Sequence, residues 1–311
     1  MISEMASDTK HFIDISDISL KDIVNILDLS TNIKAKKISP KNLIGKNIAM
    51  IFEKSSTRTR ASFESGINQL NANAIIMNAN DMHLSKGEEV SDTSKVLSRY
   101  VDGVIIRSKL HKTIKDFADN SNVPVINALS DFSHPCQIIA SIFTIIEKLG
   151  SIDNKKLTWF GEPNNVLNSY IHISAILNFE LAISAPPEMK FCDQEIAKAQ
   201  NKGAKVKIIS DPIEAAKNSD VLITDTWFSM GDESWQNNNL RQKKIDLLMP
   251  YQINQEKMNL AKSNAIFTHC LPVYRGYEAT KEVVDSKNSV IFDEAENRLH
   301  AQKAILTWLY S

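Results

Sequence analysis

The first half of the chain alternates short apolar runs with longer stretches in which apolar residues recur at helical spacing. Because these runs are continuous and rich in Ile and Val, they predict strands buried on both faces of a parallel sheet. The predicted strands are IAMIF (48–52), AIIMN (74–78), GVIIR (103–107) and VPVIN (123–127). The predicted helices are 18–35, 57–70, 92–100, 113–121 and 135–149.

The same alternation restarts at residue 156 and continues to the end of the chain. Strands are predicted at 156–161, 180–185, 205–210, 220–226, 265–271 and 289–293. Helices are predicted at 164–179, 192–203, 211–219 and, with an interrupted apolar stripe, 294–310. The interval 229–251 shows no clear period, so no element is predicted there.

Two such series of similar length predict an α/β protein of two domains, each with a central, mostly parallel sheet flanked by helices. We expect the chain to pass from one domain to the other near residues 149–151 and the last helix to pack back on the first domain. The predicted domains are residues 1–149 together with 294–311, and residues 150–293.

Polar clusters follow almost every predicted strand. In open parallel sheets ligands bind beyond the carboxyl ends of the strands, so these clusters are the candidate site. They are SSTRTR (55–60), Arg107, DFSHPCQ (131–137), GEPNN (161–165), DTWFSMG (225–231) and HCLPVYRG (269–276).

Charge and cysteine content narrow the classes of partner. The 311 residues include 36 Lys and Arg against 37 Asp and Glu, a net charge of −1, which disfavours a nucleic-acid partner. The N-terminal residues lack the apolar core of a secretory signal, and no run reaches the roughly 18 apolar residues of a membrane span. With three cysteines, an odd and sparse set, we expect a cytoplasmic protein with no membrane partner.

The SSTRTR stretch predicts an anion site. A helix N-terminus, hydroxyl groups and a guanidinium are together suited to a phosphate dianion, although the glycine frame of a Walker loop is absent. The alternative is purely structural: Ser56 or Thr57 caps the helix, and the arginines pair with Glu53 and Glu64. Arg60 fits that role best, because Glu64 lies four residues further along the same helix.

Other chemistries have weaker support. His134 and Cys136, with His269 and Cys270, are metal-ligand types whose spacing matches no usual zinc frame, so no metal is predicted. Cys270 paired with a histidine as a nucleophile lacks an accompanying oxyanion-hole signature. Only Gly161 stands where a dinucleotide fingerprint needs three glycines, so NAD and other cofactors are not expected.

Taken together, these clusters resemble the aspartate/ornithine carbamoyltransferase family from about Lys10 to the C-terminus. The resemblance is carried by FEKSSTRTRASFE (52–64), KGEEVSDTSKVLSRYVDG (86–103), HPCQ (134–137), DTWFSMG (225–231), HCLP (269–272) and AENRLHAQKAIL (295–306). It implies transfer of a carbamoyl group from carbamoyl phosphate to the side-chain amine of ornithine, giving citrulline. Another acceptor amine (N-acylated ornithine, putrescine or aspartate) and a catalytically silent homologue remain alternatives.

The resemblance also implies roles for individual residues. The phosphate would be held by Ser56, Thr57, Arg58 and Thr59, and the carbamoyl part by Arg107, His134 and Gln137. Ornithine would be bound by Asn165, Asp225, Ser229 and Met230. Cys270, Leu271 and Arg298 would complete the site and, with His83, are assigned to the binding of carbamoyl phosphate. The residues implied in the chemistry are Arg58, Arg107, His134, Gln137 and Cys270. The family implies a homotrimer, or a multiple of it, in which the loop around His83 reaches a neighbouring subunit's site.

One segment departs from the family. The family's Gly-Asp-Gly-Asn-Asn reads Gly161-Glu162-Pro163-Asn164-Asn165 in this chain. Pro163 removes a backbone N–H and restricts the turn, and Glu162 lengthens the acid by one methylene.

Overall fold

The computed structural model describes residues 9–53, 56–78, 82, 87–189, 191–228, 234 and 236–311. The chain divides into two compact units, Met1–Ile139 with Arg298–Ser311, and Ala140–Asn297. The chain passes between the units inside two helices, α5 (Pro135–Leu149) and α12 (Ile291–Leu309). The predicted domain limits, 149/150 and 293/294, lie within ten residues of these divisions, and the assignment of functions to the two domains stays a prediction.

The first unit contains a four-stranded sheet in the order β2-β1-β3-β4, with every described pair parallel. Its strands are β1 (Asn47–Phe52), β2 (Asn73–Asn78), β3 (Gly103–Arg107) and β4 (Val125–Leu129). Its helices are η1 (Ile15–Asp17), α1 (Leu20–Lys34), α2 (Thr57–Gln69), α3 (Val90–Leu97) and α4 (His111–Asp119). The central strands β1 and β3 are buried along almost their whole length, as their unbroken apolar sequences predict.

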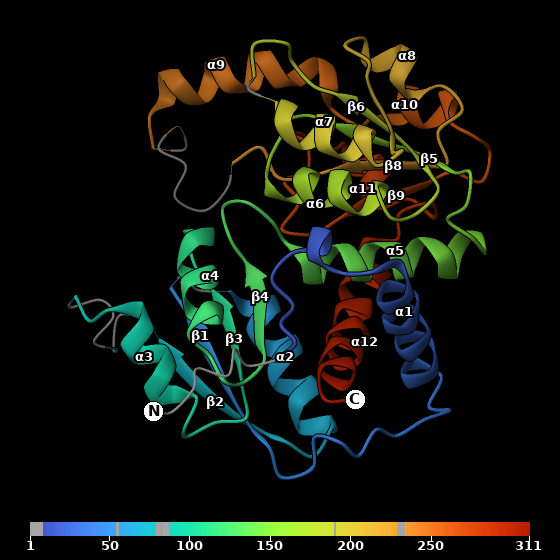
Figure 1. Ribbon diagram of the computed structural model, residues 1–311. Helices are drawn as coiled ribbons and strands as arrows, with labels where there is room; N and C mark the ends of the chain where they lie inside the picture. Colours follow the sequence, from blue (N-terminus) through green and yellow to red (C-terminus); the bar gives the residue numbers. More distant parts are fainter. Residues whose placement is uncertain are drawn as a thin grey trace. The chain divides into compact units, whose positions relative to one another are not determined.

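The C-terminal part of α12 packs on the first unit, as predicted. In Figure 1 this red helix lies beside the blue helix α1, and the Trp308 indole N–H donates to the Asp22 carboxylate at 2.9 Å. α12 also approaches α2 closely at Gly66, where an added Cβ would lie 3.2 Å from Lys303 Cγ. A larger residue at position 66 would therefore require the Lys303 and Leu299 side chains to shift.

The second unit contains a five-stranded parallel sheet in the order β7-β6-β5-β8-β9. Its strands are β5 (Lys156–Phe160), β6 (Glu180–Ser184), β7 (Lys205–Ile208), β8 (Val221–Thr224) and β9 (Ile266–His269). Its further helices are α6 (Asn165–Ser174), α7 (Asp193–Asn201), α8 (Pro212–Ala216), α9 (Asn238–Leu248), η5 (Met249–Tyr251), α10 (Gln255–Leu260) and α11 (Lys281–Val284). The central strands β5 and β8 place their carboxyl ends next to the GEPNN and DTWF segments.

The predicted strand at 289–293 is wrong. Only Ser289 forms an isolated bridge, to Phe267, and α12 already begins at Ile291. Ile291, Glu294 and Asn297 are buried while Phe292 is exposed, which is the spacing of one helix face. The helical period of the following residues therefore overrides the short apolar run.

Two further differences concern helix limits. The predicted helix 164–179 ends at Ser174, because residues 175–179 turn to enter β6. The interval 229–251, for which no element is predicted, contains the whole of α9, whose apolar stripe is too sparse to show in the sequence. None of the helices in the described ranges is long and apolar enough to cross a membrane.

Candidate active site

The turn between β1 and α2 presents a helix N-terminus. Ser56 is the N-cap residue of α2, and its hydroxyl accepts from the Thr59 backbone N–H at 3.4 Å. Thr57 and Arg58 follow in the first helical turn with exposed side chains. The capping interpretation of Ser56 is therefore correct, and the exposed Arg58 lies in the first turn of α2, where a helix N-terminus favours an anion.

Arg60 has the structural role that its spacing predicts. Its Nε lies 3.8 Å from Glu64 Oε2, and both side chains are about half exposed. The Glu53 carboxylate, the other predicted partner of the arginines, accepts a hydrogen bond from the Lys109 backbone N–H at 2.6 Å. Ser55, the first residue of the SSTRTR stretch, lies outside the described residues.

A buried hydrogen bond joins the C-terminal helix to α2. Arg298 Nη2 donates to Thr59 Oγ1 at 2.8 Å, and both residues are almost fully buried. A guanidinium so far from water needs polar partners and keeps its positive charge. The bond therefore places a fixed positive charge beside the first turn of α2.

A polar network shapes the turn that carries His134. The Ser130 hydroxyl accepts from the backbone N–H groups of Phe132 and Ser133, at 3.4 and 3.2 Å. The Asn127 side chain donates to Ser133 Oγ at 3.2 Å and so ties the turn to β4. His134 then precedes Pro135, which begins α5 at a position where a missing N–H costs nothing.

His134 is an uncharged imidazole in the neutral pH range. Burial lowers its pKa well below the ordinary value, and the positive charges of Arg298 and Arg107 lower it further. Arg107 is the last residue of β3, at the carboxyl end of the sheet, as predicted. Gln137 lies in the first turn of α5 and is also buried. The first unit thus combines two guanidinium groups with a neutral imidazole that can donate a hydrogen bond.

Cys136, next to His134, has no reactive character. Burial raises the pKa of its thiol to about 12, and its Sγ donates to the Asn127 carbonyl at 3.4 Å. It is a protonated core side chain in the neutral pH range.

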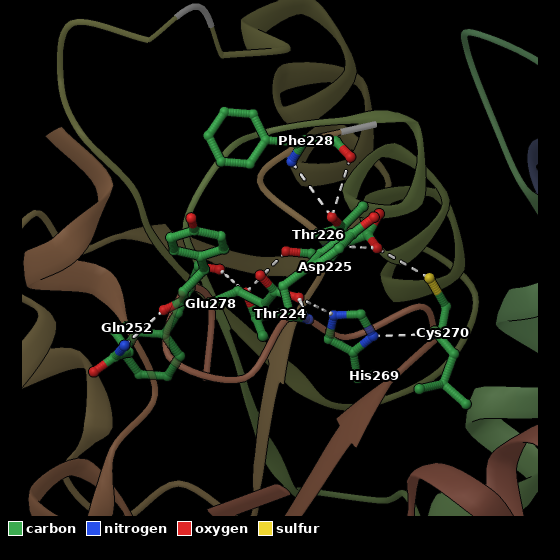
Figure 2. Close-up of polar contacts among 12 residues, drawn as sticks. Thr224, Asp225, Thr226, Phe228, Gln252, His269, Cys270 and Glu278 are labelled. Atoms are coloured by element: carbon green, nitrogen blue, oxygen red, sulfur yellow. Dashed lines mark hydrogen bonds and ion pairs between the residues drawn. The ribbon is translucent and has the colours of Figure 1, made fainter. Parts of the chain in front are cut away.

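The second unit brings together one side chain from each of three segments around Asp225. Asn164 Nδ2 donates to Asp225 Oδ2 at 2.7 Å, and the Cys270 thiol donates to Asp225 Oδ1 at 3.0 Å. Asp225 Oδ1 also accepts from the Thr226 backbone N–H at 2.8 Å. Figure 2 shows Asp225 between Thr226 and Cys270. The carboxylate is oriented by these donors and remains partly accessible, so it is suited to binding an ammonium group.

Asn164 belongs to the predicted GEPNN cluster, but the ornithine-binding role was assigned to its neighbour Asn165. Asn164 caps α6, since its side-chain oxygen accepts from Val166 N at 2.9 Å and Leu167 N at 3.1 Å, while its amide group holds Asp225. Asn165, selected instead, is the first residue of α6 and is partly accessible. The N-cap position before an apolar helix was the available signal for Asn164.

The segment after β9 is held by a buried histidine. His269 Nδ1 accepts from the Leu271 backbone N–H at 2.8 Å, and His269 Nε2 lies 3.4 Å from the buried Glu278 carboxylate. Leu271 has φ of 62°, a left-handed conformation that a bulky residue rarely adopts. The labelled His269, Cys270 and Glu278 lie together in Figure 2, so the histidine fixes the backbone that presents Cys270 and Leu271.

Asp225, His269 and Cys270 also offer three ligand types for a cation, with one ligand atom from each within 4.8 Å of the others. Both ring nitrogens of His269 already face Leu271 and Glu278, so coordination by His269 requires one of these contacts to break. This arrangement differs from a preformed metal site, in which the ligand atoms are available.

Three predicted site residues lie outside the described part of the chain. They are His83, Ser229 and Met230. Each remains a prediction.

Comparison with known proteins defines the class. A profile described as aspartate/ornithine carbamoyltransferase, carbamoyl-P binding domain, matches residues 10–147, and one described as the Asp/Orn binding domain of the same proteins matches residues 153–309. The chain belongs to the aspartate/ornithine carbamoyltransferase family.

The curated relatives and solved structures carry a more specific name. The ornithine carbamoyltransferase of Rhodopseudomonas palustris (strain BisA53) is 42% identical, over 98% of this chain and 99% of its own length. That of Methanothermobacter thermautotrophicus is 45% identical, over 96% and 98%. Among solved structures, the ornithine carbamoyltransferase from Pyrococcus furiosus has a TM-score of 0.89 at 39% identity and covers 97% of both chains. The anabolic ornithine carbamoyltransferase from Campylobacter jejuni has a TM-score of 0.88 at 40% identity, over 96% and 98%.

Proposed function

We propose that this chain transfers the carbamoyl group of carbamoyl phosphate to the side-chain amine of L-ornithine, giving L-citrulline and phosphate. The observation that carries the proposal is the Asp225 cluster, in which Asn164 and Cys270 orient a carboxylate that matches the ammonium of an amino acid. The matching names of full-length relatives support ornithine as that amino acid.

The first unit supplies the groups for carbamoyl phosphate. Ser56, Thr57, Arg58 and Thr59 hold the phosphate with first-turn N–H groups, hydroxyl groups and one guanidinium. Support for this assignment comes from the helix N-terminus at Ser56, the exposed Arg58 and the family's carbamoyl-P binding profile over residues 10–147. The corresponding domain is residues 1–149, with 294–311 contributing Arg298.

Arg107, His134 and Gln137 bind the carbamoyl part. As the deprotonated amine of ornithine attacks the carbonyl carbon, negative charge develops on the carbonyl oxygen. A neutral His134 donates to that oxygen without losing its proton, and Arg107 compensates the charge. Removal of one such preorganised donor costs about 2.7–4 kcal/mol of transition-state stabilisation. The C–N bond forms, the C–O bond to phosphate breaks, and the departing phosphate is a candidate acceptor for the amine proton.

The second domain, residues 150–293, binds ornithine. Asp225 pairs with the α-ammonium, Asn165 and the Ser229–Met230 segment bind the remaining amino-acid groups, and Cys270 and Leu271 complete the site. The partly accessible Asp225 and Cys270, together with the strained backbone of Leu271, support this assignment. Holding both reactants in register also removes an entropic cost from the transfer.

The proposal includes a homotrimer, or a multiple of it, in which His83 acts in a neighbouring subunit's site. It also includes a cytoplasmic location, supported by three cysteines that are all free thiols. Sedimentation of the purified protein tests the assembly.

An acceptor panel tests the function. The purified protein is incubated with carbamoyl phosphate and, separately, ornithine, N-acetylornithine, putrescine and aspartate, and each carbamoylated product is quantified. Citrulline as the dominant product supports the proposal. Carbamoylation of another acceptor without citrulline contradicts the choice of ornithine, and no product from any acceptor identifies a catalytically silent homologue.

A further inference from the structure

An ion pair joins the turn after β5 to the middle of α9. Glu162 Oε2 lies 2.7 Å from Lys244 Nζ, and the two side chains are 33% and 15% exposed. A pair held largely out of water is screened less than a surface pair. Glu162 is also the residue that departs from the family's aspartate, and it reaches one methylene, about 1.5 Å, further.

The face of α9 that carries Lys244 rests on aromatic rings. Lys244 Nζ lies 5.5 Å from the centre of the Phe228 ring, and the Arg241 guanidinium lies 5.8 Å from the centre of the Tyr277 ring. Arg241 also donates to the Tyr277 hydroxyl at 2.7 Å. Leu248, one turn beyond Lys244, is buried against the same aromatic cluster. Arg241, Lys244 and Leu248 are therefore one helix face, seated next to the strand end that carries Asp225.

The turn that carries Glu162 leads directly to the Asp225 cluster. Gly161, at φ of 99°, packs on Trp227, since an added Cβ would lie 3.2 Å from the indole nitrogen. Two residues after Glu162, Asn164 holds the Asp225 carboxylate. Only this short turn separates the ion pair from the side chain that orients Asp225.

We propose that Glu162 and Lys244 are a positioning pair for the amino-acid-binding half of the site. The pair holds α9 on the 161–164 turn, and so keeps Asn164 in the position from which its amide group orients Asp225. Neither residue is assigned contact with substrate. The inference rests on the proposed function, because it assigns the pair to the ornithine side of the reaction.

Steady-state kinetics test the pair with two variants of similar shape, Glu162→Gln and Lys244→Met. Each is expected to raise the KM for ornithine about 10- to 100-fold, as small displacements of a binding group do. The KM for carbamoyl phosphate is expected to stay within about twofold, because the pair is assigned only to the ornithine side of the site. The double variant is expected to have the same KM for ornithine as each single variant, because the effects of substituting two residues in direct contact do not add.

The ion pair between Lys207 and Glu180, at 3.0 Å on the outer strands of the same sheet, supplies the matched control. Lys207→Met is expected to leave both KM values unchanged. Additive effects of Glu162→Gln and Lys244→Met, or an unchanged KM for ornithine in either variant, would overturn the inference. Equal increases in both KM values, with a lower melting temperature, would also overturn it by indicating a general structural role.

A second measurement separates this inference from the proposed function. Hydrogen exchange of the 238–248 peptide is expected to be faster in Glu162→Gln than in the wild-type protein, since α9 loses its anchor. An unchanged exchange rate of this peptide in Glu162→Gln would overturn the inference that the ion pair anchors α9, whichever substrate the enzyme uses. Absence of citrulline with wild-type protein would instead overturn the proposed function, and with it the ornithine role of the pair.

Discussion

The guanidinium of Arg298 donates a 2.8 Å hydrogen bond to the hydroxyl of Thr59, although the two residues are 239 positions apart in the chain. The bond connects the C-terminal helix to the first turn of α2, where the anion is proposed to bind. It adds a buried polar contact to the packing of the C-terminal helix on the first unit.

Removal of the Thr59 hydroxyl is expected to destabilise the protein. In Thr59→Val a buried N–H of Arg298 loses its acceptor, which costs about 1–3 kcal/mol of unfolding free energy. Urea denaturation measures the change. Thr57→Val makes the same substitution at an exposed position and is expected to change stability by less than about 0.5 kcal/mol. Equal losses in the two variants would contradict a buried bond at Thr59.

Arg58 and Arg60 are expected to differ sharply in their effect on activity. Arg58→Ala removes the proposed phosphate ligand, so citrulline formation is expected to fall at least about 100-fold while the fold is retained, since the side chain is exposed. Arg60→Ala breaks only the exposed pair with Glu64, worth about 0.3–0.5 kcal/mol, and is expected to retain activity. Near-normal turnover in Arg58→Ala would remove Arg58 from the site.

Two substitutions of Asn164 separate capping from the orientation of Asp225. Asn164→Ser keeps a side-chain oxygen that can cap α6 but is too short to hold the Asp225 carboxylate, so stability is retained and the KM for ornithine rises. Asn164→Ala loses both the capping oxygen and the amide donor. It is expected to lower the free energy of unfolding by a further 0.5–2 kcal/mol, roughly the contribution of an N-cap. Thermal denaturation and ornithine titration check the two effects. An unchanged KM for ornithine in Asn164→Ser would mean that Asp225 does not need this donor.

The stability of the protein is expected to fall in mild acid through His134. Burial and the charges of Arg298 and Arg107 keep the pKa of His134 well below 6.5, its ordinary value. As the pH falls below 6.5 the unfolded chain binds a proton at this position and the native protein does not. The contribution to the free energy of unfolding is therefore complete above that pH and decreases below it, by up to about 1.4 kcal/mol per pH unit.

Urea denaturation between about pH 5 and 7, the range in which an ordinary histidine titrates, measures this dependence in the wild type and in His134→Gln. The variant is expected to show a shallower slope. A residual slope is expected from His11 and His111, since burial lowers the pKa of both. Identical slopes in the two proteins would contradict a neutral, buried His134.

The sequence by itself determined the two α/β series and the positions of most strands. Apolar runs such as IAMIF and GVIIR are a local property, because a strand buried on both faces in any fold needs them. The same pattern placed Ser56 and Arg107 at strand ends, and the spacing of Arg60 and Glu64 predicted their pairing. The prediction of a strand at 289–293 was wrong, because a short apolar run does not distinguish a strand from the start of a helix.

Only the tertiary structure decided which of these residues meet. It brings Arg298 to Thr59, joins Asn164 to Asp225, and places Lys244 on Glu162. Such contacts depend on the order of strands in each sheet and on which helix face is packed. Residues distant in sequence become neighbours only once the strand order and the packed helix faces are fixed. The apolar pattern of one sequence does not specify either of these.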